Sequence, residues 1–87
     1  MSARILVVDD EEIVIRSCVR ILGGSGYEVD AVQSGMDALR KVEESQYDVL
    51  ILDIMMPKMD GMEVLQRVKE THPDIDVIMV TGLSQIE

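Results

Sequence analysis

Apolar residues follow two patterns that alternate along the chain, one typical of strands and one typical of helices. Unbroken aliphatic runs, such as residues 5–8 and 49–52, are typical of strands buried on both faces, as in a parallel sheet. Between these runs apolar residues recur three and four positions apart, which predicts helices with one inward face. In the first helix this face consists of Ile15, Cys18, Val19 and Leu22. The predicted strands cover residues 4–10, 27–32, 49–53 and 75–81.

Residues that begin or end helices stand between the predicted strands. The first helix is expected over residues 11–22, because the Gly-Gly-Ser-Gly segment at 23–26 ends it. Ser34 and Asp37 have the spacing of a capping box, in which a side chain accepts a backbone N–H at the helix start. Asp60 is expected to cap the third helix.

Strands that alternate with helices predict an α/β fold in which a parallel sheet carries helices on both faces. The strand at residues 27–32 is more polar than the others, so we expect it at an edge of the sheet. Residues 82–87 are expected to begin a further helix.

Composition limits the possible functions. The 87 residues suffice for one domain, and a formal net charge of −9 disfavours direct binding to nucleic acid or to an anionic membrane surface. The longest apolar runs are four residues, far short of the ~20 that a membrane-spanning helix needs. A single cysteine excludes an intrachain disulfide and favours a reducing, cytoplasmic location.

Polar side chains close three of the predicted strands: Asp9 and Asp10 the first, Asp53 the third and Thr81 the fourth. The carboxyl ends of parallel strands meet at one edge, where such sheets bind ligands. If the first and third strands are neighbours, three carboxylates converge, and two charges ~4 Å apart repel by about 4 kcal/mol at an effective dielectric of 20. A divalent cation would relieve that repulsion, and an all-oxygen set favours Mg²⁺ or Mn²⁺. A carboxylate beside the ion can then accept a phosphoryl group.

Each of these residues also has a local explanation. Asp10 can be a helix N-cap, and Asp53 can form an Asx-turn with the loop that follows. Asp9 can be a solvated turn residue, and Thr81 is β-branched and suits a strand. The candidate site therefore depends on the three acids acting together.

Several motifs occur in an order that resembles the receiver domain of two-component response regulators. They are Ile-Leu-Val-Val-Asp-Asp-Glu at 5–11, Gly-Tyr-Glu-Val at 26–29, Tyr-Asp-Val-Leu-Ile-Leu-Asp at 47–53, Met-Pro-x-Met-Asp-Gly at 56–61 and Val-Thr-Gly at 80–82. The resemblance covers essentially all of residues 1–87, which we interpret as one receiver domain. It implies a flavodoxin-like, doubly wound sheet with strand order 2-1-3-4.

The resemblance also implies a role for each site residue. Asp53 matches the phosphoacceptor, which takes a phosphoryl group from a sensor histidine kinase or a phosphotransfer protein. Asp10 matches a direct Mg²⁺ ligand and Asp9 a ligand acting mainly through water. Asp53 itself also matches a ligand of the ion, and the backbone carbonyl of Met55 matches the third protein ligand. Thr81 matches the hydroxyl that moves toward the phosphoryl group when the domain switches. Such a domain is not a turnover enzyme, beyond accepting and losing its own phosphoryl group.

One departure from the family keeps other functions open. The family's fifth strand, its lysine and its last helix have no counterpart within residues 1–87, so we expect these residues to be part of a longer chain or a partner chain to supply the missing edge. The fourth strand is then expected to be an exposed edge through which copies of the chain associate. One alternative is therefore a pseudo-receiver that serves only in dimerisation or docking. Another is a phosphatase with an aspartyl-phosphate intermediate, which Met55 disfavours because those enzymes place a second Asp at that position.

Overall fold

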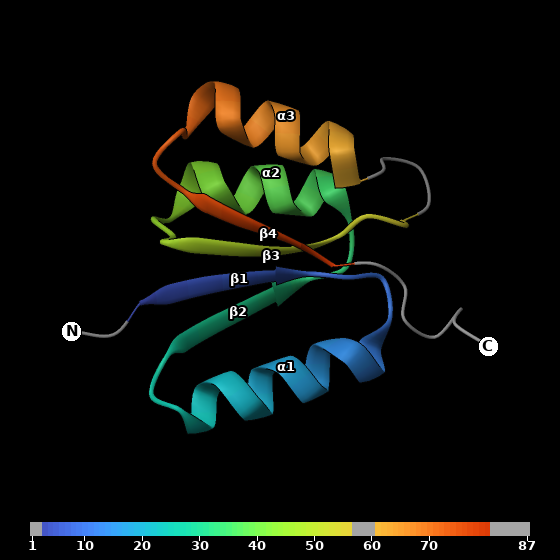
Figure 1. Ribbon diagram of the computed structural model, residues 1–87, viewed down its shortest axis with the longest axis vertical. Helices are drawn as coiled ribbons and strands as arrows, with labels where there is room; N and C mark the ends of the chain where they lie inside the picture. Colours follow the sequence, from blue (N-terminus) through green and yellow to red (C-terminus); the bar gives the residue numbers. More distant parts are fainter. Residues whose placement is uncertain (1–2, 57–60, 81–87) are drawn as a thin grey trace.

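The computed structural model describes residues 3–56 and 61–80, which form one sheet and three helices (Figure 1). The strands are β1 (Arg4–Val8), β2 (Glu28–Val32), β3 (Val49–Asp53) and β4 (Asp76–Val80). The helices are α1 (Glu12–Gly24), α2 (Gly35–Glu44) and α3 (Gly61–Thr71). The four predicted strands and the three helices between them are confirmed, with small differences at their ends.

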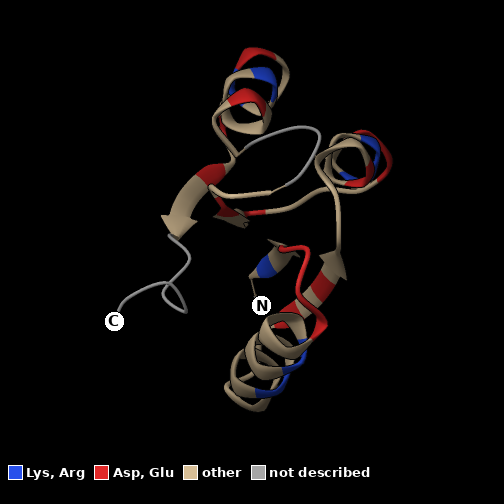
Figure 2. Ribbon diagram, turned by 90° about the vertical axis from the view of Figure 1, so that its right-hand side faces the viewer, with Lys and Arg blue, Asp and Glu red and all other residues tan. Residues whose placement is uncertain are grey.

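All neighbouring strands pair in parallel, and their order is β2-β1-β3-β4. This is the doubly wound α/β architecture and the strand order that were expected, and it places the more polar β2 at one edge. Helix α1 contacts β1 and β2 on one face of the sheet, whereas α2 and α3 lie side by side on the other face (Figures 1 and 2).

The main core lies between the sheet and the pair α2 and α3. Leu6, Leu50 and Leu52 point from the strands into this layer, and Val64 and Val68 meet them from α3, all with 0% exposure. Burying each such side chain contributes about 1.5–3 kcal/mol.

The face that carries α1 is covered less completely. No residue of α1 is fully buried, and Ile13 on its outer side is 77% exposed. The predicted inward position of Cys18 is only half-buried. On β4, Ile78 is 52% exposed.

Hydrogen bonds explain where helices begin and end. The side chain of Ser34 accepts the backbone N–H of Asp37 at 3.1 Å, which confirms the predicted start of α2. The N-cap of α1 is Glu11, without a side-chain cap bond, so the alternative of Asp10 as the cap is wrong. The N–H of Tyr27 donates to the carbonyl of Leu22 in the last turn of α1 at 3.2 Å, and β2 begins at Glu28, one residue later than predicted.

Some predictions fall outside the described part of the chain. These are the cap at Asp60, the strand end at Thr81 and the helix expected over residues 82–87. Within residues 3–56 and 61–80, no helix combines the length and the apolar character needed to cross a bilayer.

Candidate functional site

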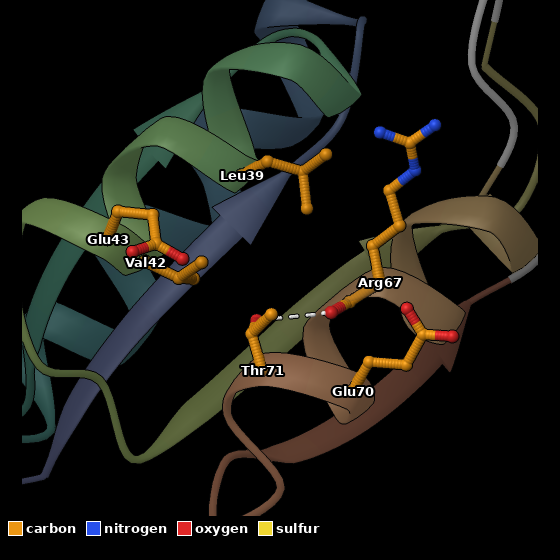
Figure 3. A pocket seen from close by; sticks show the side chains of 6 residues that line it. All are labelled: Leu39, Val42, Glu43, Arg67, Glu70 and Thr71. Atoms are coloured by element: carbon orange, nitrogen blue, oxygen red, sulfur yellow. Dashed lines mark hydrogen bonds between the residues drawn. The ribbon is translucent and has the colours of Figure 1, made fainter.

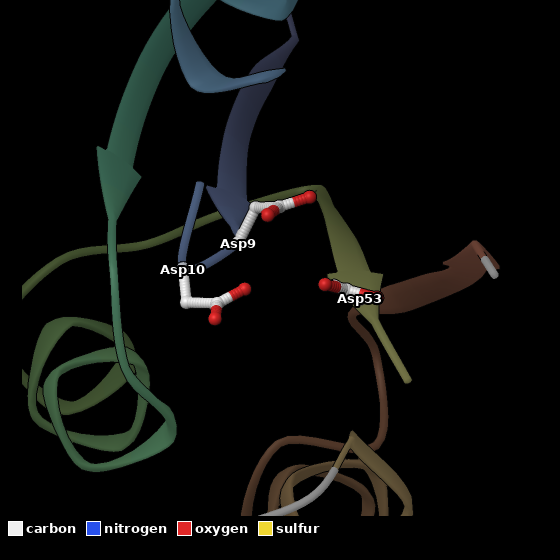
Figure 4. A group of neighbouring side chains, drawn as sticks. All are labelled: Asp9, Asp10 and Asp53. Atoms are coloured by element: carbon white, nitrogen blue, oxygen red, sulfur yellow. The ribbon is translucent and has the colours of Figure 1, made fainter. Parts of the chain in front are cut away.

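Three aspartates meet where β1 and β3 end (Figure 4). The two strands are neighbours, and Val8 pairs with Leu52, so the residues that follow, Asp9 and Asp53, lie next to each other. Asp10 lies at the start of the segment that leads to α1. Each aspartate offers one carboxylate oxygen, and these three atoms lie within 4.8 Å of one another. The predicted convergence of the three carboxylates is confirmed.

Backbone N–H groups hold two of the carboxylates in place. Oδ1 of Asp9 accepts the N–H of Glu11 at 2.9 Å, and Oδ1 of Asp53 accepts the N–H of Met55 at 3.1 Å. Both contacts are turns that span two residues, so the Asx-turn at Asp53 is also correct. The Asx-turn at Asp53 and a site shared by the three aspartates are compatible, because the turn fixes the direction in which the Asp53 carboxylate points.

The cluster is partly removed from solvent. Asp9 is 5% exposed and Asp53 is 7% exposed, whereas Asp10 is exposed. Burial raises the pKa of Asp9, the bond from the Glu11 N–H lowers it, and the charges of Asp53 and Asp10 raise it further. The net shift is upward, so the structure disfavours the ionised form of Asp9 in the absence of a compensating positive charge.

The donor set fits a hard divalent cation. The three side chains supply only carboxylate oxygens, which suit Mg²⁺ or Mn²⁺ better than softer metals. Figure 2 shows that the connection from β1 to α1 beside this cluster is acidic throughout. Two buried acids and one exposed acid make a site that is closed toward the sheet and open toward solvent.

Two further predicted site residues belong to segments beside the cluster. Met55 lies two residues after Asp53, and its side chain is 57% exposed. Thr81 lies outside the described residues. Its neighbour Val80 pairs with Asp53 in the sheet and accepts the N–H of Ile54 at 3.0 Å, so the described end of β4 is beside the acidic cluster.

A groove that the sequence did not predict lies between α2 and α3 (Figure 3). Its volume is about 480 Å³, and Leu39 and Val42 contribute its apolar side chains. The Thr71 hydroxyl donates to the carbonyl of Arg67 at 3.1 Å and is therefore engaged within its own helix. Among the described residues, the one group of three metal-ligating side chains is the acidic cluster and not this groove, so the acidic cluster is the better candidate for chemistry.

The sequence model of the response regulator receiver domain matches residues 5–87. This chain belongs to that family. The receiver domain is 38% identical over 86 residues to the response regulator MprA of Mycobacterium tuberculosis. That alignment covers 99% of this chain but only 37% of MprA, so the receiver domain spans little more than a third of that curated relative.

Solved structures support the same assignment. The response regulator TrrA of Thermotoga maritima, in complex with Mg²⁺-BeF, matches with a TM-score of 0.89 and 37% identity over 99% of this chain and 77% of that chain. The structure of the histidine kinase ThkA in complex with TrrA matches with a TM-score of 0.88 and 38% identity, over 100% of this chain and 74% of that chain. A CheY-like receiver domain from Methanospirillum hungatei matches with a TM-score of 0.92 and 34% identity, over 99% of this chain and 69% of that chain.

Proposed function

We propose that this receiver domain is a phosphoacceptor that uses Asp53 and a divalent cation. The observation that carries the proposal is the meeting of Asp9, Asp10 and Asp53 within 4.8 Å at the ends of two adjacent strands. We assign the acceptor role to Asp53 because it matches the phosphoacceptor of the family, and it stands at the end of β3, one of the two inner strands, with its carboxylate oriented by the Met55 N–H.

The proposed reaction moves one phosphoryl group. A carboxylate oxygen of Asp53 forms a bond to phosphorus, the P–N bond of a phosphohistidine breaks, and the released imidazole nitrogen keeps the electron pair and takes up a proton. Bound Mg²⁺ supplies positive charge that neutralises the oxygens of the transferring group. Asp9, Asp10, Asp53 and the backbone carbonyl of Met55 would hold that ion, and the turns at Asp9 and Asp53 orient their carboxylates.

The proposed output of the domain is a change in its surface when Asp53 is phosphorylated. Phosphorylation adds about −1.5 to −2 charge at Asp53 together with new hydrogen-bond acceptors. We propose that the Thr81 hydroxyl donates to those oxygens and that this contact shifts the segment after β4 between two states. The position of Val80 beside Asp53 supports this role, because Thr81 is the next residue along the chain.

The proposed partner is a sensor histidine kinase or a phosphotransfer protein. The similarity to TrrA, which was solved with the histidine kinase ThkA, supports a kinase. In this role the domain has no turnover activity of its own beyond gaining and losing a phosphoryl group. A cytoplasmic location is part of the proposal and is supported by the single cysteine.

A second proposal concerns association between copies of the chain. In the described sheet β4 is an edge strand, and Ile78 on it is 52% exposed. Exposed edges with apolar side chains promote strand pairing between chains. We propose that two copies can pair through β4, either together with phosphorylation or, in the docking alternative, without it.

Phosphorylation with a small phosphodonor tests the main proposal. The protein, Asp53→Asn and Asp74→Asn are each incubated with phosphoramidate and Mg²⁺, and their intact masses are measured. Asp74 is the control, because it is exposed and lies in the turn before β4. This turn is at the end of the sheet where the strand begins, whereas the acidic cluster is at the end where β1 and β3 stop. We expect the mass of one phosphoryl group on the protein and on Asp74→Asn but not on Asp53→Asn.

The same assay separates the alternatives. An unmodified parent protein would refute the phosphoacceptor and leave the docking module. Multiple turnover of a phosphomonoester would instead support the phosphatase.

A further inference from the structure

Gly61, the first residue of α3, makes an unusually close approach to the acceptor strand. It is buried, and its N–H donates to the carbonyl of Ile54 at 3.0 Å. A Cβ atom at this position would lie 2.6 Å from the carbonyl oxygen of Asp53 and 2.7 Å from Cα of Ile54. Ordinary contacts of a Cβ atom begin near 3.4 Å, so a methyl group requires a movement of about 0.8 Å. The position therefore requires glycine for lack of space.

The atoms that a methyl group would meet are backbone atoms of the candidate site. Cα of Ile54 lies between the residue that carries the acceptor carboxylate, Asp53, and the residue whose carbonyl is a proposed ligand, Met55. Pushing Ile54 turns the peptide planes on both of its sides. The same movement would therefore disturb the turn in which the Met55 N–H holds the Asp53 carboxylate at 3.1 Å.

Neither side of this contact can move away freely. On the strand side, the N–H of Ile54 donates to the carbonyl of Val80 at 3.0 Å. On the helix side, Val64 and Val68 are 0% exposed and anchor α3 in the core. A close-packed interior transmits such a displacement instead of absorbing it. The segment after Asp53 is at the end of its strand, so we expect it to shift most.

We propose that Gly61 is a positioning residue, which sets the spacing between α3 and the segment from Asp53 to Met55 and thereby the cation affinity and phosphoryl acceptance of the site. The inference rests on the proposed function and adds a residue that contacts neither the cation nor the phosphoryl group. Residues that orient metal ligands typically change metal affinity by about 10- to 100-fold when altered.

The variant Gly61→Ala tests this role, and Gly24→Ala is its matched control. Both changes add one methyl group at a terminal residue of a helix, but at Gly24 nothing lies within 4 Å of the added atom. Two readouts are made on each protein: the amide chemical shifts of residues 54 and 55 without metal, and the dissociation constant for Mg²⁺ from a titration. We expect shifted amides and at least about a tenfold weaker Mg²⁺ affinity in Gly61→Ala only.

The outcomes distinguish a failure of the proposed phosphoacceptor function from a failure of the positioning role of Gly61. If the parent protein binds no Mg²⁺, the proposed function fails. If the parent binds Mg²⁺ and Gly61→Ala binds it equally well, with or without shifted amides, this inference alone is overturned. If Gly61→Ala is unfolded in buffer, trimethylamine oxide is added to all three proteins to restore folding before the titration. A variant that stays unfolded even then also overturns the inference, because Gly61 would be required for the fold instead of for the site.

Discussion

Replacing Asp10 by Asn should make the metal-free protein more stable and at the same time weaken its response to Mg²⁺. Asp10 carries one of three negative charges whose oxygens lie within 4.8 Å of one another. A residue that only makes structural contacts would show neither effect, because the loss of its contacts lowers stability by the same amount with and without Mg²⁺.

The distance sets the size of the effect. Two unit charges 4.8 Å apart repel by about 3.5 kcal/mol at an effective dielectric of 20 and by about 0.9 kcal/mol in water. Asp10 is exposed, so the lower figure applies to its repulsion with each of Asp9 and Asp53. Removing both repulsions should raise the free energy of unfolding without metal by about 1–2 kcal/mol.

The gain from Mg²⁺ should move in the opposite direction. At ~100 times its dissociation constant, a ligand adds about 2.7 kcal/mol to the stability of the parent. A tenfold weaker affinity in Asp10→Asn reduces that gain to about 1.4 kcal/mol at the same Mg²⁺ concentration. The variant is therefore expected to be the more stable protein in EDTA and to lose most of that lead in Mg²⁺.

Urea unfolding followed by circular dichroism measures both effects, since the chain has no tryptophan to report by fluorescence. Asp74→Asn is the control, because it removes the same charge from an exposed turn that precedes β4, away from the strand ends that carry the acidic cluster. An Asp10→Asn protein with the parent's response to Mg²⁺, or with lower stability than Asp74→Asn in EDTA, would refute this reasoning.

Further predictions concern the fold and its edge. Burial raises the pKa of Tyr47 to about 12, so the folded state holds this proton more tightly than the unfolded chain does. The free energy of unfolding should therefore fall by roughly 1–3 kcal/mol as the pH rises from about 10 to about 12. Urea titrations at several pH values should show that this pH-dependent fall disappears in Tyr47→Phe and remains in Tyr27→Phe. Leu50→Ala, in the fully buried core, should cost about 2–5 kcal/mol in the same assay; a loss below 1 kcal/mol would contradict the packing. Ser34→Ala should cost about 0.5–2 kcal/mol through its lost cap, and Ser34→Gly less. If copies pair through β4, sedimentation should show a dimer that Ile78→Lys abolishes, and a concentration-independent monomer would exclude this pairing.

Local patterns in the sequence were enough to predict the elements and some of their ends. Unbroken aliphatic runs placed the strands, and β3 begins and ends as predicted. The capping-box spacing placed Ser34 at the start of α2, where its side chain accepts the Asp37 N–H. Such features depend on hydrogen bonds and burial within a few residues, so they can be read without knowledge of the fold.

The order of the strands could be anticipated only from the resemblance to a family. The site depends on that order, because Asp9 and Asp53 meet only if β1 and β3 are neighbours. Nothing in the local sequence around either residue specifies the other, since their proximity is a consequence of which helices pack on which face. The three acids could therefore be named from sequence, but their separation of at most 4.8 Å is a tertiary fact.

The sequence by itself determined an alternating α/β chain with acids at the strand ends. Only the tertiary structure decided which polar groups share a pocket, how far α1 leaves Ile13 exposed, and why residue 61 has no room for a side chain. The physical reason is that the hydrogen bonds within helices and at their caps join residues close in the chain, whereas strand pairing, charge repulsion, exposure and steric fit depend on segments that folding brings together from far apart.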